Sequence, residues 1–297
     1  MSKKYDPLKP NFRTLAWMLG PSIILLCVYL IWPIIESFRL SLFDWNGLDK
    51  SQKYAGFANW NELIHDPLFW LSVKNSFILL IVALLIQIPL GLSLAILLYR
   101  GGTRFRFFKM TYFFPGLMST VAIAILFKQV FDYNYGLLNQ VLQSLNLDFL
   151  MQDWLGDKKL AIFTVALLVC WQYTPYYMLL FLAALNGISS DVEEASAIDG
   201  ATNWKYTRFI QIPLIKGAIV TAVTLITIGS LKYFDLIWVL TAGGPESSTE
   251  VMASYLYQMA FKSYRVGYAS TVASALFLIV FLTAIFISRT TRKVREV

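Results

Sequence analysis

Long apolar runs separated by polar segments dominate the pattern of this chain. A helix that crosses the hydrocarbon core of a membrane needs about 20 mainly apolar residues. Stretches of this kind occur six times, at residues 15–35, 76–99, 110–127, 160–185, 217–240 and 268–288. The pattern predicts an all-α integral membrane protein with six transmembrane helices, the fifth being the least apolar.

Composition excludes several other classes of protein. Apolar residues make up 57% of the 297 residues and charged residues only 14%, which leaves too little polar surface to cover a water-soluble globule. Disordered, collagen-like and disulfide-stapled secreted proteins do not fit. The first apolar run is longer than the 7–15 apolar residues of a typical signal peptide, so it is expected to remain as a membrane span.

The net charge of +7 is distributed so that it predicts the orientation. Residues 1–14, 100–109, 186–216 and 289–297 carry 15 of the 25 basic residues and 6 of the 18 acidic ones. Basic segments next to membrane spans stay in the cytoplasm. We therefore expect two cytoplasmic tails, 1–14 and 289–297, around a membrane domain at 15–288, with both termini in the cytoplasm.

The loops predicted outside the membrane, 36–75 and 128–159, are long and rich in aromatic and turn residues. Apolar residues from Leu137 to Leu145 recur at helical spacing, which predicts a short amphipathic helix. Packing on the bundle and contact with a partner both fit this helix. No internal repeat relates the two halves, which weakens the case for a secondary transporter built from inverted repeats.

Candidate catalytic and metal-binding residues are few. Cys27 and Cys170 lie in apolar runs and fit small buried side chains, and His65 is the only histidine. The chain has no GxxxxGK[ST] phosphate-binding motif. An intramembrane hydrolase is therefore poorly supported, and we expect no cofactor, metal or nucleotide site in this chain.

The segment 186–216 differs from the other predicted cytoplasmic loops because it is polar and reads as two helices around a turn. Ser190 and Glu193 have the spacing of a capping box at the start of the first helix. That helix is predicted to reach Asp199, followed by Gly200 in the left-handed conformation that ends many helices.

The second helix of this loop is predicted to begin near Thr202 or Asn203 and to be interrupted by Pro213. On the first helix, the residues at 195–197 are all small. Another surface can therefore approach its backbone closely.

This loop resembles the EAA motif of binding-protein-dependent ABC importer permeases. The residues are EASAIDGA at 194–201 and IQIP at 210–213, and the spacing from Gly200 to Ile210 matches the family pattern. Two positions depart from it: Ser196 replaces an alanine and Ile212 replaces a leucine. Both replacements keep the small or apolar character.

Further motifs resemble the carbohydrate branch of that family, the maltose- and glycerol-phosphate-type permeases. They are YFD at 233–235, LTAGGP at 240–245, GYAS at 267–270 and DPLFW at 66–70. The likeness covers essentially the whole chain. It implies the type I importer permease fold, also called MetI-like.

The resemblance also implies a mechanism and partners. In this family, the first helix of the loop docks in a cleft of a separate ATPase subunit. The matching positions are Glu194, Ala195, Ser196, Asp199 and Gly200. Partners would be a second similar permease, two ATPase subunits that bind ATP and Mg²⁺, and an external solute-binding protein.

A candidate solute path lies in the fourth and fifth spans. Sugars combine apolar C–H faces with hydroxyls, and the cluster WQYTPYY at 171–177 offers flat rings and hydrogen-bonding groups. By resemblance to maltose-type permeases, the cavity positions are Tyr173, Tyr176, Ser230 and Tyr233. A structural role for these aromatic side chains fits the cluster equally.

Lys232 falls inside the predicted fifth span, where a charge facing lipid would cost about 2.5–3.5 kcal/mol. Asp235 is three residues later, on the same face of a continuous helix, and could pair with it. Solute contact and a structural ion pair both fit Lys232, and a structural role is favoured for Asp235.

Together, these features predict the permease subunit of an ATP-driven importer for a sugar or sugar-like solute. An ion-coupled secondary transporter is the alternative. The residues do not identify the solute.

Overall fold

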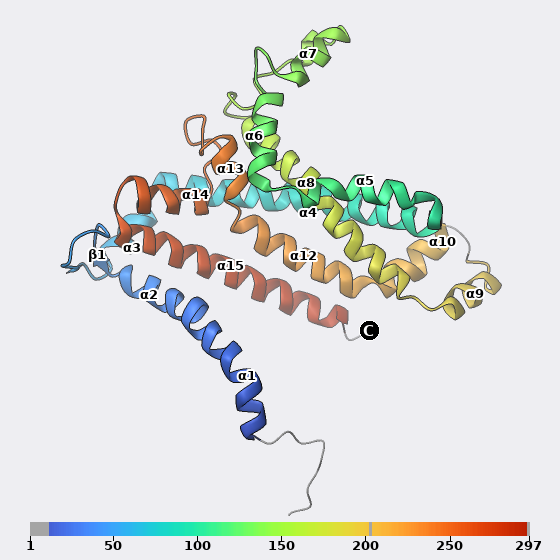
Figure 1. The fold of residues 1–297 in the computed structure, drawn as a ribbon, viewed down its shortest axis with the longest axis horizontal. Coiled ribbons are helices and arrows are strands. Elements are labelled where there is room, and N and C mark those ends of the chain that lie inside the picture. Colours follow the sequence, from blue (N-terminus) through green and yellow to red (C-terminus); the bar gives the residue numbers. More distant parts are fainter. Residues whose placement is uncertain (1–11, 202–203, 296–297) are drawn as a thin grey trace, which may run out of the picture. The chain divides into compact units, whose positions relative to one another are not determined.

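The computed structural model describes residues 12–201 and 204–295, which are mostly helical (Figure 1). The chain divides into two compact units. One comprises residues 1–65 and 259–274, and the other residues 66–258 and 275–297.

The smaller unit contains the first long apolar helix and a small hairpin. Its elements are α1 (Phe12–Leu26), η1 (Cys27–Ile31), α2 (Trp32–Leu40), β1 (Phe43–Asp44), β2 (Lys53–Tyr54), α3 (Ala58–His65), most of η5 (Gln258–Lys262) and the start of α15 (Val266–Arg295). The buried Asn59 amide donates to the carbonyl oxygens of Ser41 and Phe43 at 3.0 and 2.9 Å. These bonds attach α3 to the antiparallel pair β1–β2.

The larger unit holds the remaining elements. They are α4 (Pro67–Gly101), η2 (Gly102–Phe105), α5 (Arg106–Leu117), α6 (Thr120–Val130), α7 (Leu137–Ser144), η3 (Asp148–Leu150), α8 (Ala161–Asn186), α9 (Ser190–Ile198), α10 (Trp204–Tyr206), η4 (Thr207–Gln211), α11 (Ile212–Leu214), α12 (Lys216–Leu231), α13 (Asp235–Leu240), α14 (Met252–Tyr257) and the rest of α15. Helix α4 begins at Asp66, whose carboxylate accepts from the Leu68 amide at 2.9 Å and precedes a proline at the first helical position.

Helices α4 and α8 form the centre of the larger unit. Gly91 of α4 lies so close to α8 that an added Cβ would meet the Met178 amide nitrogen at 3.3 Å and the Tyr177 Cβ at 3.5 Å. The fully buried side chains around this contact include Leu98 and Phe181. A small residue at the crossing lets the two backbones approach, which is how helices associate in membranes.

The predicted helical membrane fold is confirmed. Five helical stretches of the described residues are long and apolar enough to cross a membrane, at 14–40, 67–101, 161–186, 216–240 and 266–290, and the fourth is interrupted at 232–234. A sixth span requires α5 and α6 together.

The third predicted span, 110–127, is wrong as a single straight helix. Helices α5 and α6 bend by 95° between Leu117 and Thr120. Pro115 precedes the break, and Met118 has extended backbone angles. Proline removes a backbone donor and favours such a break.

The expected continuous helix through the fifth span is also wrong. Helix α12 ends at Leu231, and α13 begins at Asp235 after three non-helical residues. Lys232 is therefore at a helix end and exposed. Without a continuous helix the two charges do not share a face, and no ion pair of the described residues joins Lys232 to Asp235.

The amphipathic helix predicted near residues 137–145 is confirmed as α7. Asn139 fixes it within its own loop. Its amide donates to the carbonyl oxygens of Tyr133 and Gln152 at 3.0 and 3.1 Å, and its carbonyl oxygen accepts from the Trp154 indole at 2.8 Å. The apolar face, with Leu137 59% exposed, is not covered by the part of the chain that the structure describes.

The segment between α13 and α14 buries a carboxyl group. Glu250 is 1% exposed, and its Oε2 accepts from the Gln258 amide at 2.6 Å. Its Oε1 has no hydrogen-bond partner among the described residues. Burial raises the pKa of Glu250. Gly243, with φ of +87°, leaves room for this side chain because its own Cβ would lie 2.2 Å from Oε2.

We expect Glu250→Gln to stabilise the protein by about 1–2 kcal/mol at pH values where this carboxyl is ionised in the folded protein, because it removes a buried charge. The pKa of Glu250 is higher in the folded than in the unfolded protein. At pH values between these two pKa values, Glu250 therefore binds more protons in the folded state. Stability therefore falls as the pH rises through the folded pKa. Melting in detergent at a series of pH values from 4.5, the ordinary pKa of glutamate, upward should show this slope in the wild type and a weaker slope in the variant. The exposed carboxylate variant Asp148→Asn is the control, and an unchanged slope in Glu250→Gln would contradict the assignment.

Candidate functional site

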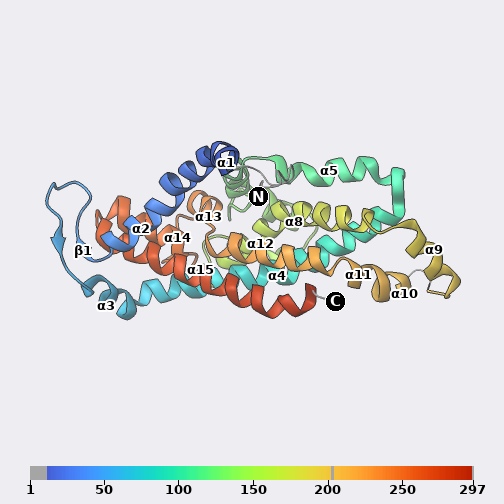
Figure 2. The ribbon, with the colours of Figure 1, turned by 90° about the horizontal axis from the view of Figure 1, so that it is seen from below.

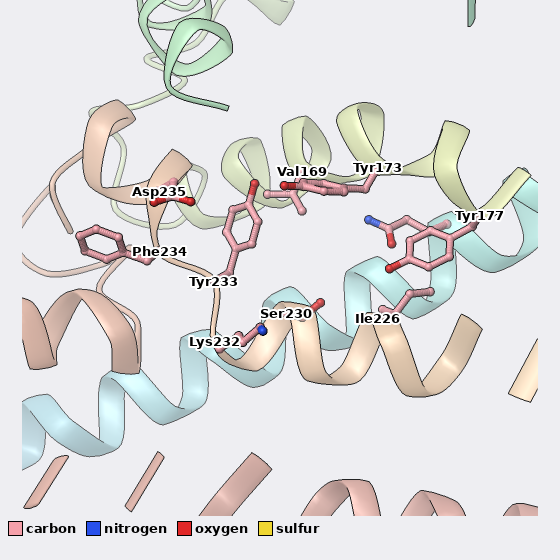
Figure 3. A pocket seen from close by; sticks show the side chains of 11 residues that line it. Val169, Tyr173, Tyr177, Ile226, Ser230, Lys232, Tyr233, Phe234 and Asp235 are labelled. Atoms are coloured by element: carbon pink, nitrogen blue, oxygen red, sulfur yellow. The ribbon is translucent and has the colours of Figure 1, made fainter. Parts of the chain in front are cut away.

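A cavity of about 270 Å³ opens where α12 stops (Figure 3). Helix α8 forms one wall, α12 the opposite wall, and α4 adds a glutamine. The lining residues are Gln87, Val169, Tyr173, Tyr177, Ile226, Gly229, Ser230, Lys232, Tyr233, Phe234 and Asp235.

The break between α12 and α13 creates this cavity. Lys232 and Phe234 have non-helical backbone angles, and the segment between them folds back so that the Tyr233 amide donates to the Ser230 carbonyl at 3.4 Å. Irregular backbone at membrane depth is tolerated where it is buried in protein or lines a water-filled cavity. Interrupted helices are a recurring feature of solute sites in transporters.

Two tyrosines dominate one side of the cavity. The rings of Tyr173 and Tyr233 meet edge to face, with centroids 6.0 Å apart. The Tyr173 hydroxyl lies 3.5 Å from the hydroxyl of Thr120 on α6. The Tyr233 hydroxyl points toward that of Tyr173 (Figure 3) and is buried without a hydrogen-bond partner among the described residues. It is a buried hydrogen-bonding group beside the Tyr173 hydroxyl and next to an aromatic face.

Two charged residues lie at the same break. Lys232 and Asp235 both line the cavity and are both exposed. Because neither side chain forms an ion pair in the described part of the chain, both are available to polar groups of a solute.

The structure brings together four of the five residues predicted for the solute path, namely Tyr173, Ser230, Lys232 and Tyr233. Tyr176 does not line the cavity. It is 51% exposed, and its ring packs edge to face on that of Tyr177, with centroids 5.3 Å apart. Its place on the path stays a prediction.

Sequence reasoning missed Gln87 and Tyr177 in the cavity wall. Gln87 is 2% exposed and is the one strongly polar side chain within the apolar run 76–99, which was a usable signal because buried polar groups in spans are costly. Tyr177 offered no signal beyond the aromatic cluster to which it belongs.

The loop 186–216 forms a helical hairpin at one end of the larger unit (Figure 2). Helix α9 ends as predicted. Gly200 has φ of +75°, its amide donates to the Ala197 carbonyl at 3.1 Å, and the Ala201 amide donates to the Ser196 carbonyl at 2.9 Å. This pair of bonds is the Schellman motif.

One detail of the loop differs from the sequence prediction. Ser190 is the first residue of α9 rather than its N-cap, which is Ser189, and no side chain caps the helix. The predicted start of the second helix at Thr202 or Asn203 lies outside the described residues, and α10 is described from Trp204. The interruption near Pro213 is confirmed, because the helix breaks at Ile215 before α12 begins.

Helix α9 presents most of its surface to solvent. Glu194, Ala195, Asp199 and Gly200 are exposed, and the apolar side chain of Ile198 is 86% exposed. Ser196 differs: it is 5% exposed, so it faces this chain rather than an outside surface.

No group of three or more metal-ligating side chains occurs among residues 12–201 and 204–295. Apolar spans, a cavity at a broken helix and an exposed polar hairpin together fit a membrane permease.

The chain belongs to the family of binding-protein-dependent transport system inner membrane components, whose profile matches residues 87–296. The family resemblance inferred from the EAA-like and LTAGGP motifs is therefore confirmed.

Relatives agree with this assignment, and a solved structure shares the fold. The chain is 34% identical to a probable ABC transporter permease of Pyrococcus horikoshii, covering 91% of this chain and 92% of that protein. It is 33% identical to the lactose transport system permease of Rhizobium radiobacter, covering 92% of each. Its fold matches a chain of a bacterial alginate ABC transporter, solved with an alginate pentasaccharide-bound periplasmic protein, with a TM-score of 0.83, 20% identity and 95% of each chain covered.

Proposed function

We propose that this chain is the permease subunit of an ATP-driven importer that moves a sugar or sugar-like solute into the cytoplasm by alternating access. One observation carries the proposal. The larger unit joins an intramembrane cavity rich in tyrosine and hydroxyl groups to an exposed helical hairpin with the EAA-like motif.

The solute class follows from the cavity wall and from the relatives. The cavity offers two edge-to-face tyrosines, the Ser230 hydroxyl, the Gln87 amide and exposed charges. Such groups suit an oligosaccharide, glycoside or polyol. Relatives of comparable length include a lactose permease and a multiple sugar-binding transport system permease of Streptococcus mutans at 30% identity.

The coupling role falls on α9. Its exposed Glu194, Ala195 and Asp199 would enter a cleft of an ATPase subunit, with Ile198 as an apolar anchor and Gly200 turning the chain back. ATP and Mg²⁺ would bind to that partner, because this chain has no phosphate-binding loop. A second similar permease and two ATPase subunits would complete the complex.

The distribution of basic residues supports the orientation. The segments 1–14, 100–109, 186–216 and 289–297 hold most of the positive charge, which would place both termini and α9 in the cytoplasm. The protein would be a multi-pass protein of a bacterial cell membrane. The loops at 36–75 and 128–159 would then face an external solute-binding protein.

Tyr233→Phe should weaken solute affinity without destabilising the protein. The hydroxyl it removes makes no hydrogen bond within 3.5 Å among the described residues, so the folded protein should lose little stability. A solute that bonds to this hydroxyl would lose one bond, and the KM for uptake should rise about 2- to 10-fold.

Uptake kinetics and a melting curve in detergent test this prediction, with Tyr29→Phe, on an exposed tyrosine of η1, as control. An unchanged KM would remove Tyr233 from the solute path.

Co-purification tests the proposed function itself. An ATPase and a second permease should accompany the tagged chain in stoichiometric amounts when the proposed partner subunits are co-expressed. An ion-coupled secondary transporter would instead purify alone and transport alone in liposomes.

A further inference from the structure

The end of α4 contacts both halves of the loop 186–216. The Arg100 guanidinium donates to the Thr207 hydroxyl at 2.6 Å, and that hydroxyl donates to Gln211 Oε1 at 2.8 Å. One residue earlier on α4, the Tyr99 hydroxyl donates to Glu193 Oε2 at 3.4 Å. Tyr99 thus reaches α9, and Arg100 reaches η4.

The Thr207 hydroxyl is used differently from several other threonine hydroxyls within the described helices. Those of Thr174, Thr221, Thr224, Thr227 and Thr283 each donate to the carbonyl oxygen four residues earlier. Thr207 instead links two side chains, one of them from another helix. Thr207 and Gln211 are 0% and 1% exposed. Buried polar groups need hydrogen-bond partners, and the Arg100 guanidinium supplies a donor to the Thr207 hydroxyl.

The local backbone makes this link possible. Residues 207–211 form the π-helical segment η4 just before Pro213. Proline cannot donate to the preceding turn, and a wider turn accommodates its ring. Helix α9 and α10 lie at the end of the larger unit where α4 passes into α5 (Figures 1 and 2).

Helix α4 connects this link to the cavity. Gln87 lines the cavity, and Arg100 lies 13 residues later on the same helix, about 20 Å away at ~1.5 Å per residue. Pro89 removes one backbone hydrogen bond between them. The close crossing of Gly91 with Tyr177 and Met178 of α8 braces the helix just beyond that point.

We propose that Tyr99 and Arg100 clamp both halves of the coupling hairpin to α4, so that movement of α9 is transmitted to the cavity wall as a rigid displacement. The inference rests on the proposed role of α9 as the contact to the ATPase, and it assigns positioning roles to Tyr99, Arg100, Thr207 and Gln211. The exposed surface of α9 contacts the ATPase partner. The clamp transmits a movement of α9 at that contact to α4 and so to the cavity wall.

Thr207→Val is the sharpest test, because valine keeps the shape and removes the hydroxyl that joins Arg100 to Gln211. The variant should assemble with the ATPase subunits in the wild-type ratio, since the α9 surface is unchanged. Stimulation of ATP hydrolysis by the solute-loaded binding protein, and uptake in proteoliposomes, should fall about fivefold or more. Thr207→Ser, which keeps the hydroxyl, should restore both to within about twofold.

A distance measurement gives a readout independent of turnover. Spin labels at Asp191→Cys on α9 and Leu97→Cys on α4, in a Cys27→Ser, Cys170→Ser background, should give a narrow distance distribution in the assembled complex. The distribution should broaden on adding Thr207→Val and narrow again with Thr207→Ser.

Wild-type stimulation, or an unchanged distance distribution, in Thr207→Val would overturn the clamp. Loss of ATPase assembly in Thr207→Val would also overturn it, because the side chains would then serve docking alone. Failure of the proposed function is separate: it would appear as absence of any ATPase from the purified wild-type complex.

Discussion

Gly200→Val should insert into the membrane normally and lose coupled transport, with uptake and stimulated ATP hydrolysis reduced about tenfold or more. Gly200 has φ of +75°, and no atom of the described residues, its two chain neighbours aside, lies within 4 Å of where its Cβ would be. The effect therefore comes from the backbone alone. A β-branched residue in the left-handed region costs about 1–2 kcal/mol, which would unwind the Schellman turn and re-aim α9.

Gly200→Asn is the matched control, because asparagine tolerates the left-handed conformation at this helix position. Like valine, asparagine adds a side chain at position 200, but it should keep most of the transport activity. Membrane insertion is checked by the yield of folded protein in detergent. Equal activity in the valine and asparagine variants would show that the turn at Gly200 does not direct α9.

Tyr173→Ala should have the largest effect among cavity variants. It removes the ring that packs against Tyr233 and the hydroxyl that lies 3.5 Å from the Thr120 hydroxyl. We expect kcat/KM for solute uptake to fall about 10- to 100-fold, from the combined loss of an aromatic face and of hydrogen bonding. Assembly with the partner subunits should be unaffected, because α9 and its contacts lie elsewhere.

Phe163→Ala on the same helix is the control, since Phe163 is 47% exposed and does not line the cavity. Uptake by vesicles at several solute concentrations separates the two variants. If Tyr173→Ala transports as well as Phe163→Ala, the cavity at the α12–α13 break is not the solute path.

Hydropathy and motif spacing predicted the membrane class, the family and the turn at Gly200. These predictions succeed for two reasons. A membrane span must form its backbone hydrogen bonds internally and carry apolar side chains, and a positive φ at a helix end favours glycine. Pro115 was a visible hint of the 95° bend between α5 and α6. Hydropathy did not reveal the bend, because it is averaged over a window longer than the break between the two helices.

The break at 232–234 had no comparable signal. Neither glycine nor proline occurs there, and a helical periodicity through Lys232 and Asp235 was the natural expectation. What stops α12 is tertiary packing, in which Tyr233 turns toward Tyr173 and α13 packs on α6. Such contacts between residues distant in sequence also explain why the burial of Glu250 and the link from Arg100 to Thr207 could not be predicted.

Reconstitution tests the central claim most directly. The chain is assembled in proteoliposomes with its second permease and ATPase. ATP is enclosed inside the vesicles, where it reaches the ATPase. A labelled sugar is added outside together with the cognate binding protein. We predict accumulation of the sugar that requires ATP and the binding protein together. Accumulation driven by an ion gradient with this chain alone, without ATP or binding protein, would contradict the account.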